Sequence, residues 1–274
     1  MPSLPRFETL ALTTADAVTV LELNRPGKAN AMNLLMWAEI GAAMGWIDET
    51  PEVRVAVIRG AGEHFCAGID LDLLHHLREQ VADDCAARAA EKLRRLILEM
   101  QDALSAIERC RKPVLAAVHG ACVGAGVDLI AACDMRYCAI DAQFSVKEVD
   151  VGITADLGTL QRLPRLIGDG MMRELAYTGR NVSGAEAKDI GLVNRSYMDT
   201  AALMRDTMTL AATIAAKSPL AVRGAKEMIT YARDHSVADG LNYVATWNAA
   251  MLMSADIGEA IAAGRERREP KFRD

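Results

Sequence analysis

The sequence predicts an α/β fold followed by a helical region, and three of its features indicate this. Short runs rich in β-branched residues alternate with longer stretches whose apolar residues recur at helical spacing. The run Pro113–Val118 is apolar throughout, as expected for a strand covered on both faces. After Gly158 the pattern turns mainly helical. Alternating strands and helices are typical of helices layered on a sheet.

Four strands are expected, at Val18–Leu23, Val53–Ile58, Pro113–Val118 and Met135–Ala139. The first ends at the turn Asn24-Arg-Pro-Gly27, and the second ends at Gly60-Ala-Gly62. Glycine and proline at these points interrupt a strand because they favour turns.

Helical spacing extends over Asn33–Asp48, and from Leu71 to about Arg109 with a polar patch near Glu79–Asp84. Another helix is expected to follow the small-residue turn Gly120–Gly126 and to continue through Ala132. Further helices are expected at about 157–167, 169–178, 184–189, 200–216, 219–234, 237–251 and 256–264. We therefore divide the chain into an α/β core, residues 1–198, and a helical region, residues 199–274.

The composition supports a large aliphatic core and argues against two classes of partner. Hydrophobic residues make up 51% of the 274 residues, aromatic residues only 4%, and 14 residues are Met. The formal net charge is −6. A nucleic-acid or membrane-surface partner calls for a basic face, so neither is expected.

The cysteines and the chain termini bear on the compartment. The six cysteines form no C-x-x-C pair and mostly lie in apolar runs, which indicates buried reduced thiols rather than disulfides or zinc ligands. The N-terminal segment lacks the pattern of a secretion signal or transit peptide, and the last residues do not match a peroxisomal tripeptide. The longest apolar stretch, Val114–Cys133, is interrupted by glycines and Asp128, so it does not resemble a membrane span. We expect a cytoplasmic protein.

Two turns are candidates for binding an anion or a developing oxyanion. Cys66-Ala-Gly-Ile-Asp70 lies between a predicted strand and a helix, where backbone N–H groups are left free. An ordinary tight turn is the alternative. The stretch His119–Asp128 repeats the arrangement, but its glycine spacing does not fit a dinucleotide fingerprint. His119 is a possible general base, although a lone histidine beside a buried strand is more often structural.

Acidic residues cluster in the segment Phe144–Asp156. Glu148, Asp150 and Asp156 lie among apolar and small residues, where a carboxyl should have a raised pKa suited to proton transfer near neutral pH. Each acid could instead be a surface residue, and Asp156 is a plausible helix N-cap. No G-x-S-x-G elbow or metal-binding cluster is present in the sequence. The residues alone thus indicate acid–base chemistry beside an oxyanion, without naming a substrate.

Nearly the whole chain, from about Phe7 to Phe272, resembles the enoyl-CoA hydratase/isomerase (crotonase) superfamily. The motifs that carry this resemblance are Leu23-Asn-Arg-Pro26 with Asn30-Ala-Met-Asn33, Phe65-Cys-Ala-Gly-Ile-Asp70, Lys112-Pro-Val to Gly126, and Gly158-Thr-Leu-Gln-Arg-Leu163. Within the family, the chain is most similar to the Δ3,5-Δ2,4-dienoyl-CoA isomerase subgroup. That similarity lies in Val146–Pro164, Cys133–Cys138, Arg233-Asp-His-Ser236 and Ala245-Thr-Trp-Asn248.

The resemblance implies a crotonase-like spiral of ββα units with a C-terminal helical region that drives trimerisation, or hexamers built from two trimers. It implies a bound acyl-CoA whose thioester oxygen is held by the backbone N–H groups of Ile69 and Ala125. The family usually has Gly at the second position, but Ala keeps the N–H. No metal or redox cofactor is implied, because coenzyme A is part of the substrate.

Residues near the coenzyme A are implied in the same way. The loop after Cys66 is expected to follow the pantetheine, and its members are Ala67, Gly68, Ile69, Asp70 and Leu71. Lys28, Asn30 and Ala31 are expected near the nucleotide end. Lys28 is attractive for a phosphate, but could equally be a solvated turn residue.

The acids suggest which reaction is catalysed. Family hydratases carry glutamates at the positions of Asp128 and Glu148 and usually Gly at the position of Asp156. A shorter first acid and an added third acid suit a proton shift along a dienoyl chain better than hydration. We expect Glu148 to act at C2 and Asp156 at C6, with the reverse open, while Asp128 tunes their protonation. The alternatives are an enoyl-CoA hydratase and a catalytically silent binding protein of the family.

Overall fold

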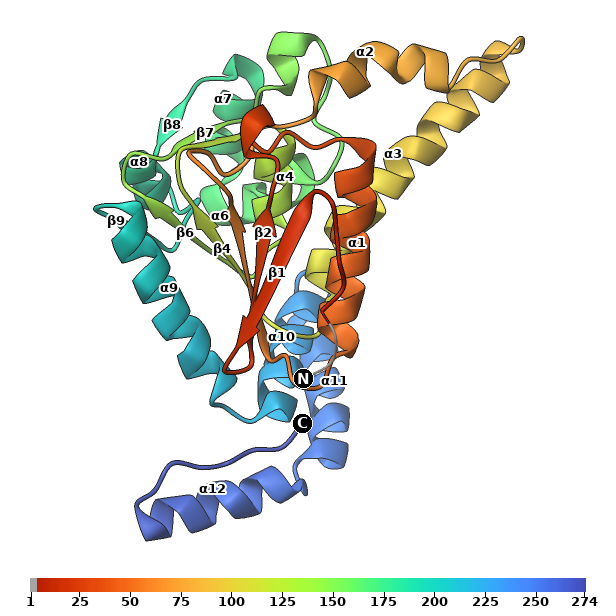
Figure 1. Cartoon of the computed structure of the whole chain (residues 1–274). Coiled ribbons are helices and arrows are strands. Elements are labelled where there is room, and N and C mark those ends of the chain that lie inside the picture. Colours follow the sequence, from red (N-terminus) through yellow and green to blue (C-terminus); the bar gives the residue numbers. More distant parts are fainter. Residues whose placement is uncertain (1–3) are drawn as a thin grey trace.

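The computed structural model describes residues 4–274 and shows helices layered on a six-stranded sheet (Figure 1). The first three residues of the N-terminal segment lie outside this range. The strand order is β1-β2-β3-β4-β6-β9, with β1 antiparallel to β2 and the other pairs parallel. These strands are β1 Leu10–Ala15, β2 Val18–Leu23, β3 Val55–Gly60, β4 Val114–Val118, β6 Met135–Ala139 and β9 Arg195–Tyr197. The four predicted strands are therefore confirmed, with β3 starting two residues later than expected.

A second, smaller sheet holds the loops of the site. Its order is β5-β7-β8, formed by β5 Ala121–Val123, β7 Gln143–Ser145 and β8 Val182–Ser183. The expectation that Gly120–Gly126 is only a turn is wrong, because β5 forms within it. Cys122 pairs with Phe144 of β7 and also forms a bridge to Cys66. The bridge from Cys122 to Cys66 connects the two glycine-containing turns, which are far apart in the sequence.

Helices cover both faces of the main sheet. In β3, Val55 and Val57 contact the cluster that includes α9, Thr200–Ala215, whereas Ala56 and Ile58 belong to the cluster on the other face. On that second face lie α1, Leu34–Glu49, and α3, Ala86–Arg109. Successive strand residues point to opposite faces, so β3 and β4 must be apolar at nearly every position.

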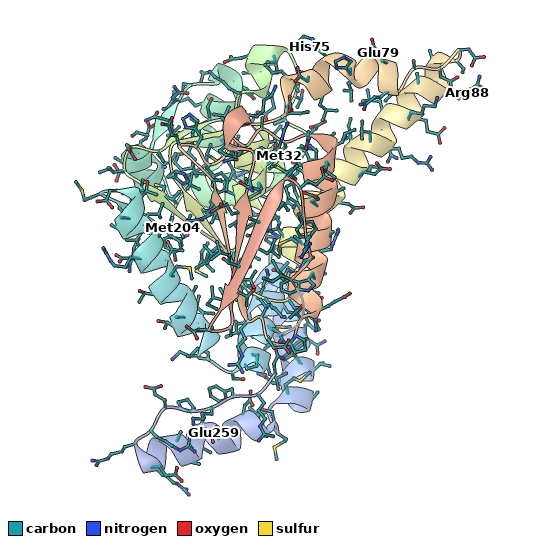
Figure 2. All side chains as sticks on the ribbon, viewed as in Figure 1. Met32, His75, Glu79, Arg88, Met204 and Glu259 are labelled. Atoms are coloured by element: carbon teal, nitrogen blue, oxygen red, sulfur yellow. The ribbon has the colours of Figure 1, made fainter. Side chains whose placement is uncertain are left out.

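The helix predicted from Leu71 to Arg109 is divided where the polar patch was noted. It forms α2, Leu71–Gln80, and then α3. Figure 2 shows Glu79 and Arg88 at the tip where these helices meet, far from the sheet. Five of the six cysteines are buried, and Cys85, near that tip, is partly exposed.

The remaining helices follow the predicted pattern closely. They are α4 Ala125–Ala131, α5 Thr159–Arg162, α6 Pro164–Ile167, α7 Asp169–Thr178, α8 Gly184–Asp189, α10 Pro219–Ala232, α11 Val237–Met251 and α12 Ala255–Glu266. In Figure 1, α12 extends away from the sheet at the C-terminal end. In the described part of the chain, no helix is both long and apolar enough to span a membrane. The division at residue 198 stays a prediction, and α9 packs directly on the sheet.

Candidate active site

The loop between β3 and α2 leaves one backbone N–H group free. Met32 donates its N–H to Gly68 O at 2.8 Å, and Asp70 donates to Met32 O at 2.9 Å. Ile69 lies between these bonds, and its own N–H has no acceptor in the described part of the chain. Gly68 has a φ of 99°, a backbone conformation that favours glycine.

The first residue of α4 supplies a second free N–H group. Ala125 follows Gly124, which has a φ of 52° and provides no side-chain cap. Within residues 4–274, the Ala125 N–H donates to no acceptor, as is usual in the first turn of a helix. A Cβ added to Gly68 would lie 3.8 Å from Ala125 N. The two turns are thus in contact, and each brings a free N–H group to the junction.

Glu148 lies beside this junction. It begins the short 3-10 helix Glu148–Val151, and a Cβ added to Gly124 would lie 3.2 Å from its Oε1. Its Oε2 is buried without a hydrogen-bond partner among the described residues. Burial, with a smaller effect from the charge of Asp128, raises the pKa of Glu148 to about 7. This half-buried carboxyl can therefore exchange a proton near neutral pH.

Asp128 lies on α4 and is almost fully buried. Its Oδ1 accepts a hydrogen bond from Thr159 N at 2.7 Å, at the start of α5. Burial raises its pKa to about 6, although this hydrogen bond lowers it in part. Asp128 thereby does what the sequence suggested for Asp156 as an N-cap. The suggestion that Asp156 is a helix N-cap is wrong, because the N-cap residue of α5 is Gly158, which has no side chain to cap the helix.

Asp156 is close to the other two acids but faces a different space. Burial raises its pKa, and its charge raises the pKa values of both Asp128 and Glu148. It remains exposed in the single chain and lines a cavity of about 390 Å³. In the described part of the chain, the cavity that Glu148 lines does not include Asp156. The three acids therefore form one electrostatic group whose members open onto more than one cavity.

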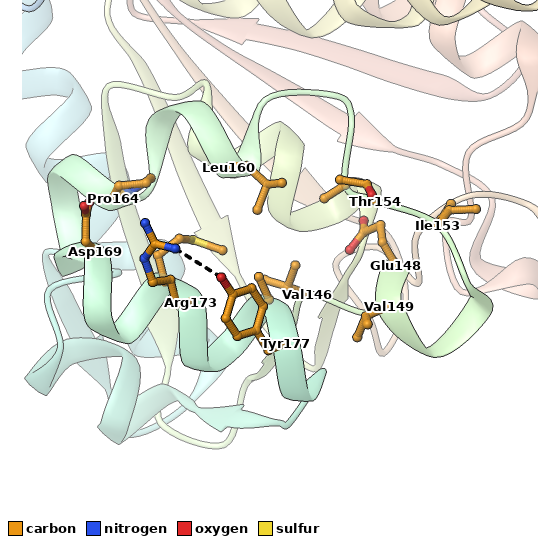
Figure 3. A pocket seen from close by; sticks show the side chains of 13 residues that line it. Val146, Glu148, Val149, Ile153, Thr154, Leu160, Pro164, Asp169, Arg173 and Tyr177 are labelled. Atoms are coloured by element: carbon orange, nitrogen blue, oxygen red, sulfur yellow. Dashed lines mark hydrogen bonds between the residues drawn. The ribbon is translucent and has the colours of Figure 1, made fainter.

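The cavity beside Glu148 has a volume of about 520 Å³ (Figure 3). Glu148 and Thr154 lie at one end in this view, and Arg173 and Tyr177 lie toward the other. Arg173 donates to Tyr177 Oη at 3.1 Å. Its apolar lining residues are Val146, Val149, Ile153, Ala155, Leu160, Pro164, Met172 and Ala176. An apolar wall that starts at a carboxyl suits a hydrocarbon chain attached to a reactive group. Sequence reasoning missed Arg173 and Tyr177, because nothing in the local sequence distinguishes them from surface residues.

The residues expected near coenzyme A lie in two loops that side-chain bonds hold together. Arg25 Nη1 forms an ion pair with Asp70 Oδ2 at 2.8 Å and also donates to Ala31 O. The Asn30 side chain is fully buried and donates to the carbonyl groups of Ala61 and His64. Asn30 therefore holds loops together through its side chain, while Arg25, which sequence reasoning did not select, links the two segments that are expected near coenzyme A.

The exposed members of this region are Lys28 and Leu71. Lys28 Nζ lies 3.1 Å from Asp72 Oδ2, and both side chains are largely solvated. Leu71 is 58% exposed at the start of α2, and Ala67 donates its N–H to Ala29 O. Lys28 can exchange its weak surface partner for a phosphate at little cost.

His119 and Asp150 are not part of the junction. His119 Nε2 lies 3.0 Å from Gly62 O in a buried position, which is the structural alternative that the sequence left open. Asp150 forms an exposed ion pair with Lys147 at 2.7 Å. Groups of three or more His, Cys, Asp or Glu side chains able to hold a metal are not found within residues 4–274.

Two free N–H groups beside coupled carboxyls with raised pKa values define a class of enzyme that moves protons next to a stabilised oxyanion. The model of the family described as enoyl-CoA hydratase/isomerase matches residues 13–274. The chain belongs to this family.

Individual proteins of known name are similar to this chain over nearly its whole length. A peroxisomal Δ3,5-Δ2,4-dienoyl-CoA isomerase of Arabidopsis thaliana is 49% identical, over 99% of this chain and 98% of its own. A mitochondrial protein of the same name from Homo sapiens is 47% identical, over 97% of this chain and 81% of its own. The crystal structure of an enoyl-CoA hydratase from Bacillus anthracis has a TM-score of 0.88 and 32% identity, over 97% and 99% of the two chains. These matches confirm the predicted fold and family.

The expectation of a cytoplasmic protein is wrong. The names of the relatives just described place one in the peroxisome and one in the mitochondrion. The sequence argument failed because it relied on missing targeting patterns, and a missing pattern does not identify a compartment.

Proposed function

We propose that the protein isomerises 3,5-dienoyl-CoA thioesters to 2,4-dienoyl-CoA. The observation that carries this proposal is the third acid, Asp156, whose charge acts on both Glu148 and Asp128. The relatives named Δ3,5-Δ2,4-dienoyl-CoA isomerase support the same reaction. A proton that leaves one carbon and returns to another four bonds away requires acids at separated places along the chain.

The mechanism begins at the thioester. The N–H groups of Ile69 and Ala125 donate to the carbonyl oxygen, and the polarised carbonyl makes the C2 proton acidic. Glu148 takes this proton, and the electron pair delocalises onto the thioester oxygen and through the two double bonds to C6. Asp156 donates a proton to C6, which gives the conjugated 2,4-diene. Proton exchange between the acids and solvent then resets both groups. Losing one oxyanion donor should cost roughly 3–4 kcal/mol of transition-state stabilisation.

Position supports Glu148 at C2, because its carboxyl lies against Gly124, next to the Ala125 N–H. The pKa values do not decide between the two roles, because burial raises the pKa of Glu148 to about 7 and also raises that of Asp156. We give position more weight, because a base must be within reach of its proton and coupled acids share protons among themselves. Asp128 tunes this sharing, as its charge raises the pKa of Glu148.

The remaining parts of the substrate have places in this scheme. The acyl chain would lie between Glu148, which lines the cavity of about 520 Å³, and Asp156, which lines the cavity of about 390 Å³, so that C2 faces the first acid and C6 the second. The pantetheine would follow Ala67–Leu71, and the exposed Lys28 would contact a phosphate. The reaction transfers protons only, so it calls for no metal or redox cofactor. Coenzyme A enters as part of the substrate.

Assembly into trimers, or hexamers of two trimers, is part of the proposal. Large apolar side chains are exposed on α10 and α11 and in the turn before α12, including Ile229 at 74%, Leu241 at 63% and Met253 at 89%. Such a patch is costly in water and is typical of a surface covered by another chain. Copies of this chain are the partners that the family resemblance implies.

A substrate panel tests the function. Wild-type protein is mixed with a 3,5-dienoyl-CoA or with crotonyl-CoA, and conjugated-diene absorbance and hydration are followed. We expect the diene to react much faster than crotonyl-CoA is hydrated, and Glu148→Gln to lower diene turnover by roughly 10²-fold or more. Dominant hydration that survives Asp156→Asn would favour the hydratase alternative. Failure of every acyl-CoA to bind or react would favour a silent binding protein.

A further inference from the structure

The backbone that carries Asp156 is held from one side by a network of polar side chains. The Asp156 carboxyl itself has no side-chain hydrogen bond among residues 4–274, so its position depends on its main chain. Gln101 Nε2, from α3, donates to Asp156 O at 2.6 Å. Arg162 Nη1, from the end of α5, lies 3.4 Å from Leu157 O. Two successive carbonyl groups are therefore fixed by side chains that line the cavity of about 390 Å³.

Gly158 makes room for the second of these side chains. It has a φ of 126°, and a Cβ added there would lie 1.8 Å from Arg162 Nη1. No side chain larger than hydrogen is compatible with this approach. The guanidinium of Arg162 therefore packs directly on the turn that follows Asp156, while Asp128 holds Thr159 N on the next residue.

Arg162 is in turn held by α3. Its Nε lies 3.2 Å from Glu108 Oε1, its Nη2 lies 3.4 Å from Glu108 Oε2, and Nη2 also contacts Ser105 Oγ at 3.3 Å. The Arg162 side chain is only 14% exposed and that of Glu108 only 21%. A planar guanidinium held by both carboxylate oxygens has little freedom to turn.

Glu108 has a second partner, which comes from the helical region. Arg233, at the end of α10, donates from Nη1 to Glu108 Oε1. Burial alone would raise the pKa of Glu108, but hydrogen bonds from Arg233 and Arg162 lower it, so the carboxylate stays charged. Arg233 belongs to the motif Arg233–Ser236, whose role the catalytic scheme leaves unexplained.

We propose that Arg162 is a positioning residue for Asp156, that Glu108 holds it in place, and that Arg233 connects the helical region to this support. The inference rests on the proposed function, in which Asp156 exchanges a proton with the acyl chain. An arginine that sets the place of an acid acts through that acid, so its effect should vanish once the acid is removed. A displacement of about 1 Å at a reacting group lowers turnover by roughly 10²-fold.

A double-mutant cycle tests the dependence on Asp156. Arg162→Gln and Glu108→Gln are made alone and together with Asp156→Asn, and Asp102→Asn on α3, which removes the exposed pair with Arg109, serves as the control. With a 3,5-dienoyl-CoA, we expect Arg162→Gln to lower kcat roughly tenfold or more, and Glu108→Gln to lower it by less. KM and the Kd of a saturated acyl-CoA should change less than about threefold. In the Asp156→Asn background neither change should lower kcat further.

Three results would overturn the inference. They are an unchanged kcat in Arg162→Gln, a multiplicative loss in the Asp156→Asn background, and a parallel loss of saturated acyl-CoA binding. Arg162→Lys keeps the charge without the planar fork, so it should restore kcat only in part.

Amide hydrogen exchange tests the positioning without any substrate. We expect the amides of residues 156–159 to exchange roughly tenfold faster in Arg162→Gln than in wild type or Asp102→Asn. Unchanged exchange would refute the positioning role, whatever the reaction. If wild-type protein does not convert the diene, but Arg162→Gln still exchanges these amides faster, only the proposed function would be refuted.

Discussion

At the scale of single residues, the site depends on three carboxyl groups whose pKa values are raised. Burial raises the pKa values of Asp128, Glu148 and Asp156, and the charge of Asp156 raises the pKa values of the other two further. The sequence predicted a raised pKa for Glu148 and Asp156, because these two acids lie among apolar residues, but it made no such prediction for Asp128. It did not predict that Asp128 bonds to Thr159, 31 positions along the chain, which removes the N-cap role from Asp156.

The pH dependence of kcat/KM tests the direction of proton transfer. If Glu148 is the base, it must be ionised, so kcat/KM should rise as the pH increases through about 7, the pKa of this group. The rise should be absent in Glu148→Gln. A kcat/KM that instead falls through pH 7 would mean that Glu148 is the proton donor, with Asp156 acting at C2.

The stability of the fold should depend on the protonation of Asp128. Its pKa of about 6 in the folded chain exceeds the usual 3.8, so the stabilisation is complete below pH 4 and is lost as the pH rises through 6. The loss corresponds to about 3 kcal/mol. Asp128→Asn, whose amide oxygen can still accept from Thr159 N, should lack this loss. The free energy of unfolding in urea is measured for both proteins between pH 4 and pH 7. If it depends on pH equally in the two proteins, the role of Asp128 is contradicted.

At the scale of elements, the active site is made where short segments from different turns meet. Most of the long strands and helices could be predicted, because their apolar patterns extend over several turns or alternations, but the six-residue strand β1 was missed. The strands β5, β7, β8 and β9 have two or three residues each and were also missed. Their pairing comes from partners far along the chain, as between Cys122 and Phe144, and no local pattern records it.

Gly124 tests the contact between these segments. Gly124→Ala forces a side chain into a φ of 52° and places its Cβ 3.2 Å from Glu148 Oε1. We expect a loss of about 1–3 kcal/mol in unfolding free energy and a drop in kcat of roughly tenfold or more. Gly45→Ala is the matched control, since nothing lies near its Cβ on α1 and alanine favours a helix. Full activity in Gly124→Ala would show that the turn does not position Glu148.

At the scale of the whole molecule, the helical region has two roles in this account. Arg233 bonds to Glu108, which holds the positioning residue of Asp156. The apolar side chains on α10–α12 remain exposed in the single chain. The sequence predicted the helices of this region from their spacing. It could not reveal the pairing of Arg233 with Glu108, because the two residues are 125 positions apart.

Assembly can be tested by introducing charged residues into the exposed apolar patch on α10–α12. Replacing Ile229 and Leu241 by Lys should convert the oligomer to smaller species, because buried charge at an interface is costly. Glu52→Lys, at an exposed position before β3, serves as the control. Light scattering coupled to size-exclusion chromatography measures the mass. Wild-type protein that is monomeric at micromolar concentration would contradict the proposed trimer or hexamer.

The central claim is that Asp156 makes this site a dienoyl-CoA isomerase. The most direct measurement compares wild type with Asp156→Asn in the conversion of a 3,5-dienoyl-CoA, alongside the Kd of a saturated acyl-CoA. The account predicts a fall in kcat of roughly 10²-fold or more, with the Kd changed less than about threefold. Unchanged turnover in Asp156→Asn would remove this acid from the mechanism and contradict the account.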